Sequence, residues 1–462
     1  MEKIVINNLE LDESQTKAII NDSKSTIVIA GAGSGKTLTI QGKIKYLIEE
    51  KKIKEDEILC ISFTNETVNN LYNKLLSLGY DIEVKTFHKL GLKFLDTKNI
   101  TIASDDYLSY IIDEYFKSYI KYDKNKANLF KTINYTNKSI DYLLNSKEYN
   151  NLKTLINTFI KLSKCNDISL KQIYKMYKWS FFRDKVILRY ILEIYRLYEL
   201  ELESSNKIDI NDIIIKSKEH IKEYKLKYKY IIIDEFQDTS MIRLNLIKEI
   251  IKITNAKLFV VGDDFQSIYR FSGCDLDLFI NFKNYFEDTK YFYLRNTYRN
   301  SNQLIYVSVN FIMRNPNQLR KNIISNKNNY KPIKILFNYS LEDTLNLIEK
   351  KEDILVLGRN NKDIENINFT NKLTIHKSKG LEADNIILIN SDNIPSKIKD
   401  DQILNKLKLN KDRFPYNEER RLFYVALTRT KNNIYILVNN PSLFIKELIR
   451  DYKNFIEIKK KN

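Results

Sequence analysis

Cysteine is almost absent from this 462-residue sequence, which has only Cys60, Cys165 and Cys274. They lie far apart and form no Cys-x-x-Cys pair, which argues against a structural zinc site and a disulfide framework and fits a reducing compartment. Uncharged apolar runs of membrane-spanning length are also missing, and residues 1–13 lack the apolar core of a secretory signal. We therefore expect a cytoplasmic protein that does not enter a membrane.

Acidic residues are too few to balance the basic ones. The chain has 59 Asp and Glu against 76 Lys and Arg, a formal net charge of +17. This excess favours a polyanionic partner, with nucleic acid first. A Lys-rich composition explains the charge equally well, because Asn, Ile, Lys and Tyr are all abundant. Hydrophobic residues make up 43% of the chain, which is typical of a globular protein with two or three domains.

Glycine is scarce too, with ten residues, but three of them lie within residues 31–35. The stretch Ser25–Thr37, STIVIAGAGSGKT, predicts a strand and a tight loop, and apolar residues at helical spacing from Leu38 to Glu50 predict a helix after it. In such a loop, backbone N–H groups surround phosphate oxygens, Lys36 reaches the β- and γ-phosphates, and the Thr37 hydroxyl holds Mg²⁺. The alternative is a Gly-rich turn with a chance lysine, but the flanking strand and helix supply the context that a phosphate site requires.

This loop predicts that the protein binds a nucleoside triphosphate with Mg²⁺. Ala30 occupies the position where the general pattern has its first glycine, and its small side chain leaves the prediction in place. The residues predicted to surround the phosphates are Ala30, Gly31, Ala32, Gly33, Ser34, Gly35, Lys36 and Thr37.

Two adjacent carboxylates follow another apolar run, Tyr230–Ile233. A strand that delivers Asp234 and Glu235 at its C-terminal end suits hydrolysis of Mg²⁺-ATP. Asp234 is expected to coordinate the metal through water, and Glu235 to orient and deprotonate the attacking water. The alternative, an acidic turn that caps the next helix, loses weight in a chain that also carries a phosphate loop.

Two further predicted strands end in residues suited to nucleic acid. Ile58–Phe63 leads into Thr64 and Asn65, and Ile82–Thr86 leads into Phe87 and His88. Ligands bind at this edge of a parallel sheet. Phe63 and Phe87 are candidate stacking platforms for bases, each worth about 1–3 kcal/mol if used. For either phenylalanine alone, a place in the core is the simpler interpretation.

Glycine and proline nearly vanish between about Gly91 and Ser205. Apolar residues recur there at three- and four-residue spacing, which predicts a helical insertion. It is rich in Tyr and Lys and holds Trp179, the only tryptophan. Tyrosines interleaved with lysines are compatible with a nucleic-acid path, but helix–helix contacts explain most of them. No catalytic residue can be chosen from this region.

Taken together, the motifs resemble those of the UvrD/Rep-type superfamily 1 helicases, which translocate along single-stranded DNA, and within that family the DNA helicase IV branch most. The resemblance covers about residues 11–88 and 229–440. The strings that carry it, beyond the phosphate loop, are DEFQD, GDDFQSIYRFSG, LRNTYRN with NFIMRNPNQLRK, TIHKSKGLEAD and EERRLFYVALTRTK. So many strings in the family's order leave little room for chance.

The resemblance implies an α/β fold of two RecA-like P-loop domains with parallel sheets and a helical insertion in the first. The boundaries that we expect are 1–90 and 206–288 for the first domain, 91–205 for the insertion, 289–458 for the second domain and 459–462 for a frayed basic tail. The interval between Arg359 and Thr374 is short. The accessory domain that larger relatives insert there is therefore expected to be absent or minimal.

Roles at the nucleotide follow from the resemblance, residue by residue. Gln15 would select adenine, Tyr298 would stack on the base, and Glu382 would lie near the ribose. Gln266 would sense the γ-phosphate beside Asp234 and Glu235. The arginine fingers of the second domain would be Arg299 and Arg429, which close on the γ-phosphate across the cleft and so couple hydrolysis to domain closure.

Positions that meet DNA, or that couple it to ATP, follow in the same way. They are Phe63, Thr64, Asn65, His88, Tyr269, Phe271 and His376. One departure is Ser272, where many relatives carry arginine, so one DNA contact is expected to be missing. Binding mainly through phosphates and stacking implies an affinity that falls steeply with salt.

The sequence leaves two functions open. The first is an ATP-dependent 3′→5′ translocase and helicase acting on single-stranded DNA and on single-strand/duplex junctions, in repair, recombination or phage defence. The second is an ATP-gated DNA sensor, a DNA-stimulated ATPase subunit that signals to a partner such as a nuclease and unwinds little. The trimmed architecture fits the second function as well as the first.

Overall fold

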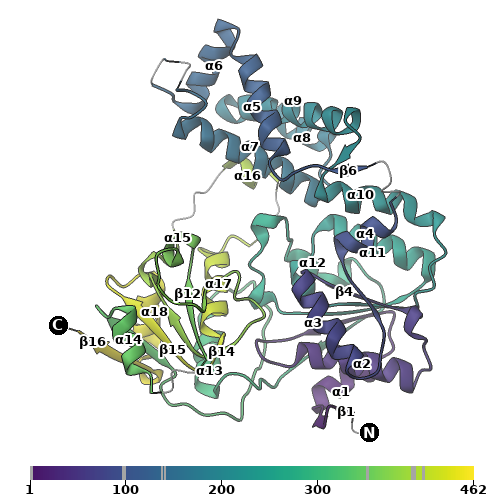
Figure 1. Cartoon of the computed structure of the whole chain (residues 1–462), viewed down its shortest axis with the longest axis vertical. Coiled ribbons are helices and arrows are strands. Elements are labelled where there is room, and N and C mark those ends of the chain that lie inside the picture. Colours follow the sequence, from purple (N-terminus) through teal and green to yellow (C-terminus); the bar gives the residue numbers. More distant parts are fainter. Residues whose placement is uncertain are drawn as a thin grey trace.

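The computed structural model describes residues 4–95, 100–136, 139, 142–349, 353–396, 402–407 and 412–461. Within these ranges the chain forms two six-stranded sheets flanked by helices, and a separate helical body (Figure 1). Every strand pair within the two large sheets is parallel. The predicted α/β class with two parallel sheets is therefore confirmed.

The first sheet has the strand order β10-β3-β9-β8-β4-β5. Its strands are β3 (Ser25–Ile29), β4 (Ile58–Ser62), β5 (Glu83–Thr86), β8 (Tyr230–Ile233), β9 (Lys257–Gly262) and β10 (Thr289–Tyr293). β3, β4 and β8 are buried at every position, as their continuous apolar runs require for a sheet covered on both faces. The associated helices are α1 (Glu13–Ile20), α2 (Lys36–Glu49), α3 (Asn65–Leu76), α4 (Phe87–Lys93), α10 (Ile210–His220), α11 (Met241–Thr254) and α12 (Asp277–Ile280). A short antiparallel pair, β1 (Val5–Ile6) and β2 (Leu9–Glu10), precedes them.

One predicted boundary is wrong. Residue 289 was expected to open the second domain, but β10 pairs along its length with β3 of the first sheet, Thr289 beside Ser25 and Tyr293 beside Ile29. Phe292 and Tyr291 pack against the first domain's core from the two faces of this strand. The first sheet domain therefore extends through Tyr293.

The second sheet has the strand order β13-β12-β14-β15-β11-β16. Its strands are β11 (Ile333–Phe337), β12 (Ile354–Gly358), β13 (Lys372–Thr374), β14 (Ala383–Leu388), β15 (Thr430–Val438) and β16 (Ile456–Lys460), and its helices are α13 (Asn302–Ile312), α14 (Leu341–Leu347), α15 (Asn361–Ile364), α17 (Asn417–Leu427) and α18 (Leu443–Asp451). The expected frayed tail begins too early at 459, because Lys459 and Lys460 pair with Leu336 and Phe337 in this sheet.

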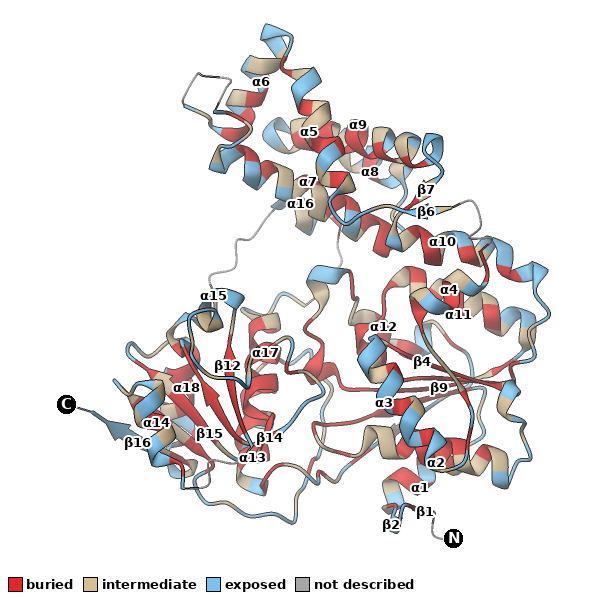
Figure 2. Ribbon diagram, viewed as in Figure 1, coloured by how far each residue is buried: buried red, intermediate tan, exposed pale blue. Residues whose placement is uncertain are grey.

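The helical domain consists of α5 (Tyr107–Tyr119), α6 (Asp123–Ile133), α7 (Lys147–Cys165), α8 (Leu170–Lys178) and α9 (Phe182–Ser204). Its core holds aromatic as well as aliphatic side chains, with Phe116 edge-on to Tyr149 and Tyr190. β6 (Thr101–Ile102) and β7 (Lys207–Ile208) pair where the chain enters and leaves it. Figure 2 shows this core and the two sheets as separate buried regions. No helix within the described ranges is both long and apolar enough to cross a membrane.

A segment of the second half of the chain crosses to the helical domain. After β14 the chain reaches α16 (Gln402–Asn405), which lies against the helical domain in Figure 1, and then returns to α17. Ile403 and Leu407 are buried in the helical domain's core, and the Lys406 ammonium lies 3.1 Å from a carboxylate oxygen of Asp184. We call residues 402–407 the crossing segment.

Candidate nucleotide and nucleic-acid site

The loop between β3 and α2 needs its glycines. Gly33 and Gly35 have φ of +70° and +79°, the left-handed region that side chains disfavour. A Cβ on Gly33 would lie 2.5 Å from the Cβ of Arg299, and one on Gly35 would lie 2.7 Å from an amide nitrogen of Gln15. The glycines thus let two other predicted site residues approach the loop closely. Lys36 opens α2, so the free N–H groups of a helix N-terminus adjoin the loop.

A segment that leads into the second sheet domain lies directly on this loop. The Thr297 hydroxyl donates a hydrogen bond of 2.8 Å to the carbonyl of Ala32, and the Tyr298 N–H donates one of 2.9 Å to the carbonyl of Gly33. The segment that leads into the second domain is thus held on the phosphate loop by two backbone carbonyls.

Lys36 and the two predicted acids are adjacent. The Lys36 ammonium lies 2.9 Å from a carboxylate oxygen of Glu235, which follows β8. Burial opposes ionisation of Glu235, but Lys36 and then Lys379 outweigh it and lower its pKa. Burial, followed by the negative charge of Glu235, raises the pKa of Asp234. A cation beside Asp234 would favour its charged form, and the Asp234 carboxylate and Thr37 hydroxyl are oxygen ligands that fit Mg²⁺.

Gln266 is one of the points where the two sheet domains meet. Its side-chain nitrogen donates to Asp263 of the first domain at 2.5 Å, and its side-chain oxygen accepts a hydrogen bond of 2.9 Å from the Arg429 guanidinium of the second. Lys379, also from the second domain, donates to the Gln266 carbonyl at 2.8 Å. The structure thus brings Gln266 together with one of the two predicted arginine fingers.

The two predicted arginine fingers are close enough to repel each other. Burial, and next the positive charge of Arg299, lower the pKa of Arg429 to about 9. Arg429 is 1% exposed, and its guanidinium is otherwise held by backbone carbonyls such as that of Leu381. Arg299 is paired instead with Glu382, at 2.6 Å. One buried and one partly buried guanidinium beside a phosphate loop are suited to an anion that bears several negative charges.

The predicted base-binding residues lie on the other side of the loop. Gln15 is fully buried, and its side chain accepts from the Asp12 N–H and donates to Thr39. Tyr298 is 50% exposed, and its hydroxyl donates to Asp12 at 2.9 Å. Tyr298 therefore offers an open ring face, whereas the Gln15 amide is occupied by contacts within the protein.

Three predicted DNA residues form one aromatic cluster, Tyr269, Phe271 and His376. The Phe271 and His376 rings meet edge-to-face with centroids 5.6 Å apart, and the Tyr269 hydroxyl donates to the His376 carbonyl at 2.9 Å. Phe271 is 63% exposed, so the cluster presents an aromatic edge to solvent. Burial, and next the charge of Arg359, lower the pKa of His376 to about 4, which leaves this imidazole neutral at pH 7.

The remaining predicted DNA residues lie at the ends of β4 and β5, and the structure does not place them in the aromatic cluster. Thr64 caps α3, accepting from the Thr67 N–H, and Asn65 is exposed. Phe63 is half-buried with the Arg243 guanidinium 4.5 Å from its ring centre, and burial lowers the pKa of His88 to about 4. Phe87, considered as a stacking platform, is 2% exposed and belongs to the core. That interpretation of Phe87 is wrong.

Two lysines of the site were missed. The Lys379 ammonium pairs with Asp238, lies 3.8 Å from Glu235 and sits 5.0 Å from the ring centre of Tyr269, so it touches the acids and the aromatic cluster at once. Lys321 pairs with Asp263 and Asp264 and donates to the Ala30 carbonyl at 2.9 Å. Lys321 and Lys379 lie within the recognised strings LRK and HKSKG, but among so many basic residues no local pattern sets them apart.

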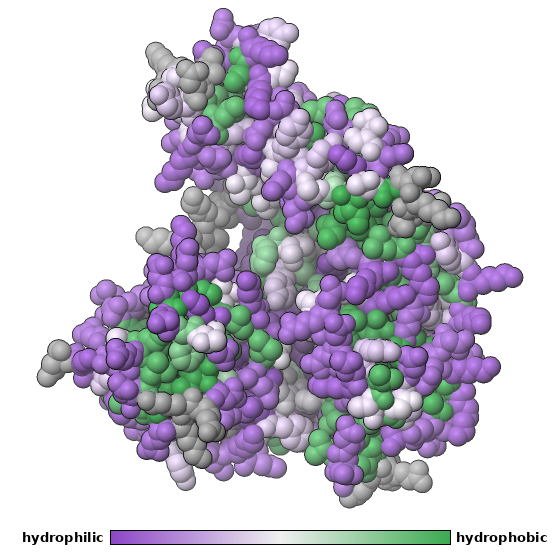
Figure 3. Space-filling model, viewed as in Figure 1, coloured by the Kyte–Doolittle hydropathy of each residue, from purple (hydrophilic) through white to green (hydrophobic). Residues whose placement is uncertain are grey.

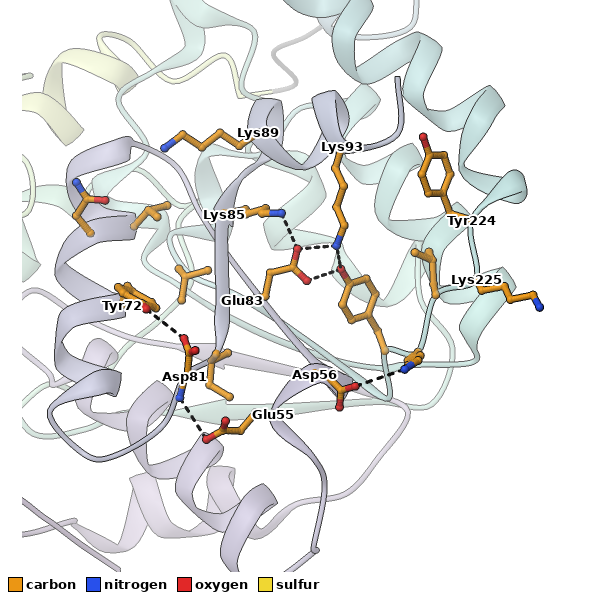
Figure 4. Close-up of a pocket in the computed structure, with 17 residues that line it drawn as sticks. Glu55, Asp56, Tyr72, Asp81, Glu83, Lys85, Lys89, Lys93, Tyr224 and Lys225 are labelled. Carbon is orange, nitrogen blue, oxygen red and sulfur yellow. Dashed lines mark hydrogen bonds and ion pairs between the residues drawn. The ribbon is translucent and has the colours of Figure 1, made fainter. Parts of the chain in front are cut away.

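A cavity of about 770 Å³ lies away from this site, at the free edge of β5. Figure 4 shows Glu83 at its centre, reached by Lys85 and Lys93. The Tyr228 hydroxyl also donates a hydrogen bond of 2.6 Å to Glu83. Burial opposes ionisation of Glu83, but hydrogen bonds from the three residues outweigh it and lower its pKa to about 2. Because Glu83 is already paired with Lys85 and Lys93, these groups do not form a second nucleotide site in the cavity.

Comparison with known proteins matches two family models to the two halves of the chain. The model of the UvrD/REP helicase N-terminal domain matches residues 11–287, and that of the UvrD-like helicase C-terminal domain matches residues 357–441. DNA helicase IV of Escherichia coli strain K12 is 27% identical over an alignment that covers 96% of this chain and 70% of the relative. A probable DNA helicase of Mycoplasma pneumoniae is 25% identical, with coverage of 96% and 87%. ATP-dependent DNA helicase Rep of Buchnera aphidicola is 28% identical over 73% of this chain, which spans 48% of its length.

Proposed function

The chain belongs to the UvrD/REP helicase family, and from that premise we propose that it is an ATP-dependent translocase on single-stranded DNA that moves 3′→5′ and unwinds duplexes. The observation that carries the proposal is the meeting of groups from both sheet domains at Gln266. On one side lie the phosphate loop, Asp234 and Glu235, and on the other lie Arg299 and Arg429.

Each residue then has a role that its surroundings permit. Lys36 exchanges its contact with Glu235 for the nucleotide phosphates, which frees the Glu235 carboxylate to take a proton from the attacking water. Arg299 and Arg429 neutralise charge on the γ-phosphate, and Gln266 reports its presence to both domains. Thr37 and Asp234 would hold Mg²⁺, which would supply neutralisation of the phosphate charge. Tyr298 stacks on adenine, with Gln15 and Glu382 beside the base and the ribose.

Coupling to DNA follows from the loop after β13. Residues 375–381 carry both His376, in the aromatic cluster, and Lys379, which contacts Asp238 and the Gln266 carbonyl. A base that displaces the cluster must therefore move the loop that also holds Lys379. DNA at His376 and phosphate chemistry near Lys379 thus both act on the loop of residues 375–381.

The test is steady-state ATP hydrolysis with and without single-stranded DNA. We expect strong stimulation by DNA in the parent protein. Glu235→Gln should reduce it by about 10²–10⁴-fold, because a general base is lost, and Lys36→Ala should abolish it. Glu342→Gln, at an exposed residue of α14, is the matched control and should hydrolyse ATP normally. Hydrolysis that ignores DNA would contradict the proposal.

Strand displacement then separates the finer alternatives. Substrates with a 3′ or a 5′ overhang report direction, and we expect unwinding only from the 3′ overhang. Stimulated hydrolysis without unwinding of either substrate would favour the DNA sensor that works with a partner, such as a nuclease.

A further inference from the structure

The turn between α8 and α9 displays three aromatic side chains to solvent. Trp179, Phe181 and Phe182 are 82%, 75% and 92% exposed, while Ser180 between them is buried and donates to the Met176 carbonyl at 2.7 Å. Phe182 has a φ of +49°, a backbone conformation that bulky residues rarely adopt. We call Trp179–Phe182 the aromatic turn. A contiguous exposed apolar patch of this kind marks an interaction site.

Positive charge surrounds the aromatic turn. The exposed cations on α8 and at the start of α9 are Lys171, Lys175, Lys178, Arg183 and Lys185. Lys178 lies 5.0 Å from the ring centre of Tyr174 and Lys185 lies 5.4 Å from that of Tyr177, so both are held beside aromatic faces. The one acid in this stretch, Asp184, is already paired with Lys406. The patch therefore combines planar apolar surfaces with uncompensated cations.

The aromatic turn lies near the nucleic-acid side of the molecule. Asp184, two residues after it, contacts Lys406 of the crossing segment, which comes from the second sheet domain. At the C-terminal end of α7, four residues before α8 begins, the Asn166 side chain donates to the Gly273 carbonyl, two residues from Phe271. The four residues before α8, the rise of about 1.5 Å per residue in α8 itself and the Asn166 contact together place the turn within about 40 Å of Gly273. On the face in Figure 3 the surface is hollowed between the helical domain and the second sheet domain.

We propose that Trp179, Phe181 and Phe182 form a stacking platform for unpaired DNA bases, with the surrounding lysines holding the phosphates. The inference rests on the proposed function and adds to it a second base-binding surface, outside the two sheet domains. Bases of any sequence present a flat face to such a platform, while cations track the backbone. A strand that leaves the aromatic cluster along the helical domain meets the platform next.

Charge and position favour DNA over the other occupants of an exposed aromatic patch. A second copy of this chain carries the same excess of positive charge, so the patch has no electrostatic complement there. A membrane surface would attract the lysines equally, but it does not explain why the patch adjoins the segment that joins the helical domain to the second sheet domain. Single-stranded DNA accounts for the rings, the cations and the place in the fold together.

Trp179 allows a direct test, because it is the only tryptophan of the chain. Its fluorescence is titrated with a 20-nucleotide oligothymidylate, and binding is followed separately by the anisotropy of a labelled strand. We expect quenching whose midpoint coincides with the anisotropy midpoint. Phe181→Ala/Phe182→Ala should weaken binding about tenfold or more. Tyr122→Ala, at a 70% exposed residue of the same domain, is the matched control and should bind normally.

The other outcomes separate the platform from the proposed function. Unchanged fluorescence, together with normal binding by the double variant, would refute it, and ATP hydrolysis still stimulated by DNA would leave the proposed function standing. Quenching without any stimulation of hydrolysis would uphold the platform and refute the proposed function. A blue shift with phosphatidylserine vesicles but no quenching by DNA would assign the patch to a membrane surface. A blue shift that grows with protein concentration would assign it to a second copy.

Discussion

Lys321 allows the clearest quantitative prediction. Its side chain is 3% exposed and its ammonium is shared by Asp263 and Asp264, neither of which is exposed to solvent. Lys321→Met would leave two adjacent buried carboxylates without their cation. Removing one partner of a buried pair costs about 3–5 kcal/mol, because the remaining charge is uncompensated.

Protonation of one of the two carboxylates limits the loss of folding free energy in the variant. Burial already raises the pKa of Asp264 above its ordinary value of 3.8, so Asp264 is the carboxyl that would take up a proton in the variant. Keeping it protonated costs about 1.4 kcal/mol per pH unit, or about 4 kcal/mol at pH 7 and about 2 kcal/mol at pH 5.5. A raised pKa in the folded state gives stability that is lost as pH rises. The penalty should therefore be larger at neutral pH than at pH 5.5.

Thermal melts at pH 7 and pH 5.5 provide the assay. We expect Lys321→Met to lower Tm by about 5–10 °C at pH 7 and by roughly half as much at pH 5.5. Adding Asp264→Asn should recover much of the loss. Lys331→Met, at an exposed lysine ten residues away, is the control. A Lys321→Met melt within 1 °C of that control at both pH values would refute the reasoning.

Four further predictions follow from the site and its supports. Between pH 6.5 and pH 4, His376→Asn should lose less stability than the parent protein. Burial lowers the pKa of His376 in the folded state to about 4, so the parent loses stability as pH falls through that window. Measuring Tm as a function of acid pH checks this. The same variant should leave the salt dependence of DNA binding unchanged, since the imidazole is neutral at pH 7. Gly33→Ala should raise the Kd for ATP at least tenfold, because a Cβ would lie 2.5 Å from Arg299, and equilibrium binding of a fluorescent ATP analogue measures it. Ile403→Asp should release the crossing segment and speed its cleavage in limited proteolysis, whereas the exposed Gln402→Asp should not.

The parts of the fold that the sequence predicted are those that local patterns determine. Apolar runs predicted β4 and β8 to within about a residue and the last three residues of β3, because a strand buried on both faces is mostly apolar. The loop and acid motifs then placed Lys36 beside Glu235 without any knowledge of the sheet order, since the ends of parallel strands share one edge.

What the sequence did not predict depends on partners far away along the chain. β10 joins β3 across more than 250 residues, and nothing within TKYFY distinguishes that edge from the second sheet. Ile403 and Leu407 are two apolar residues in a Lys-rich stretch, and only the tertiary structure gives them a core to enter. Lys321 is one of 76 basic residues until the fold sets it against Asp263 and Asp264.

The chain that leads into the crossing segment limits how far the second sheet domain can move away from the helical domain. Six peptide units join Ser396, whose N–H is held by Glu419 of the second sheet domain, to Gln402. A chain of that length spans at most about 22 Å. While Ile403 and Leu407 remain buried, the second sheet domain can move away from the helical domain only until this connection is fully extended. A larger separation of the second sheet domain from the helical domain would have to pull Ile403 and Leu407 out of the helical domain's core, so this connection sets an upper limit on domain opening.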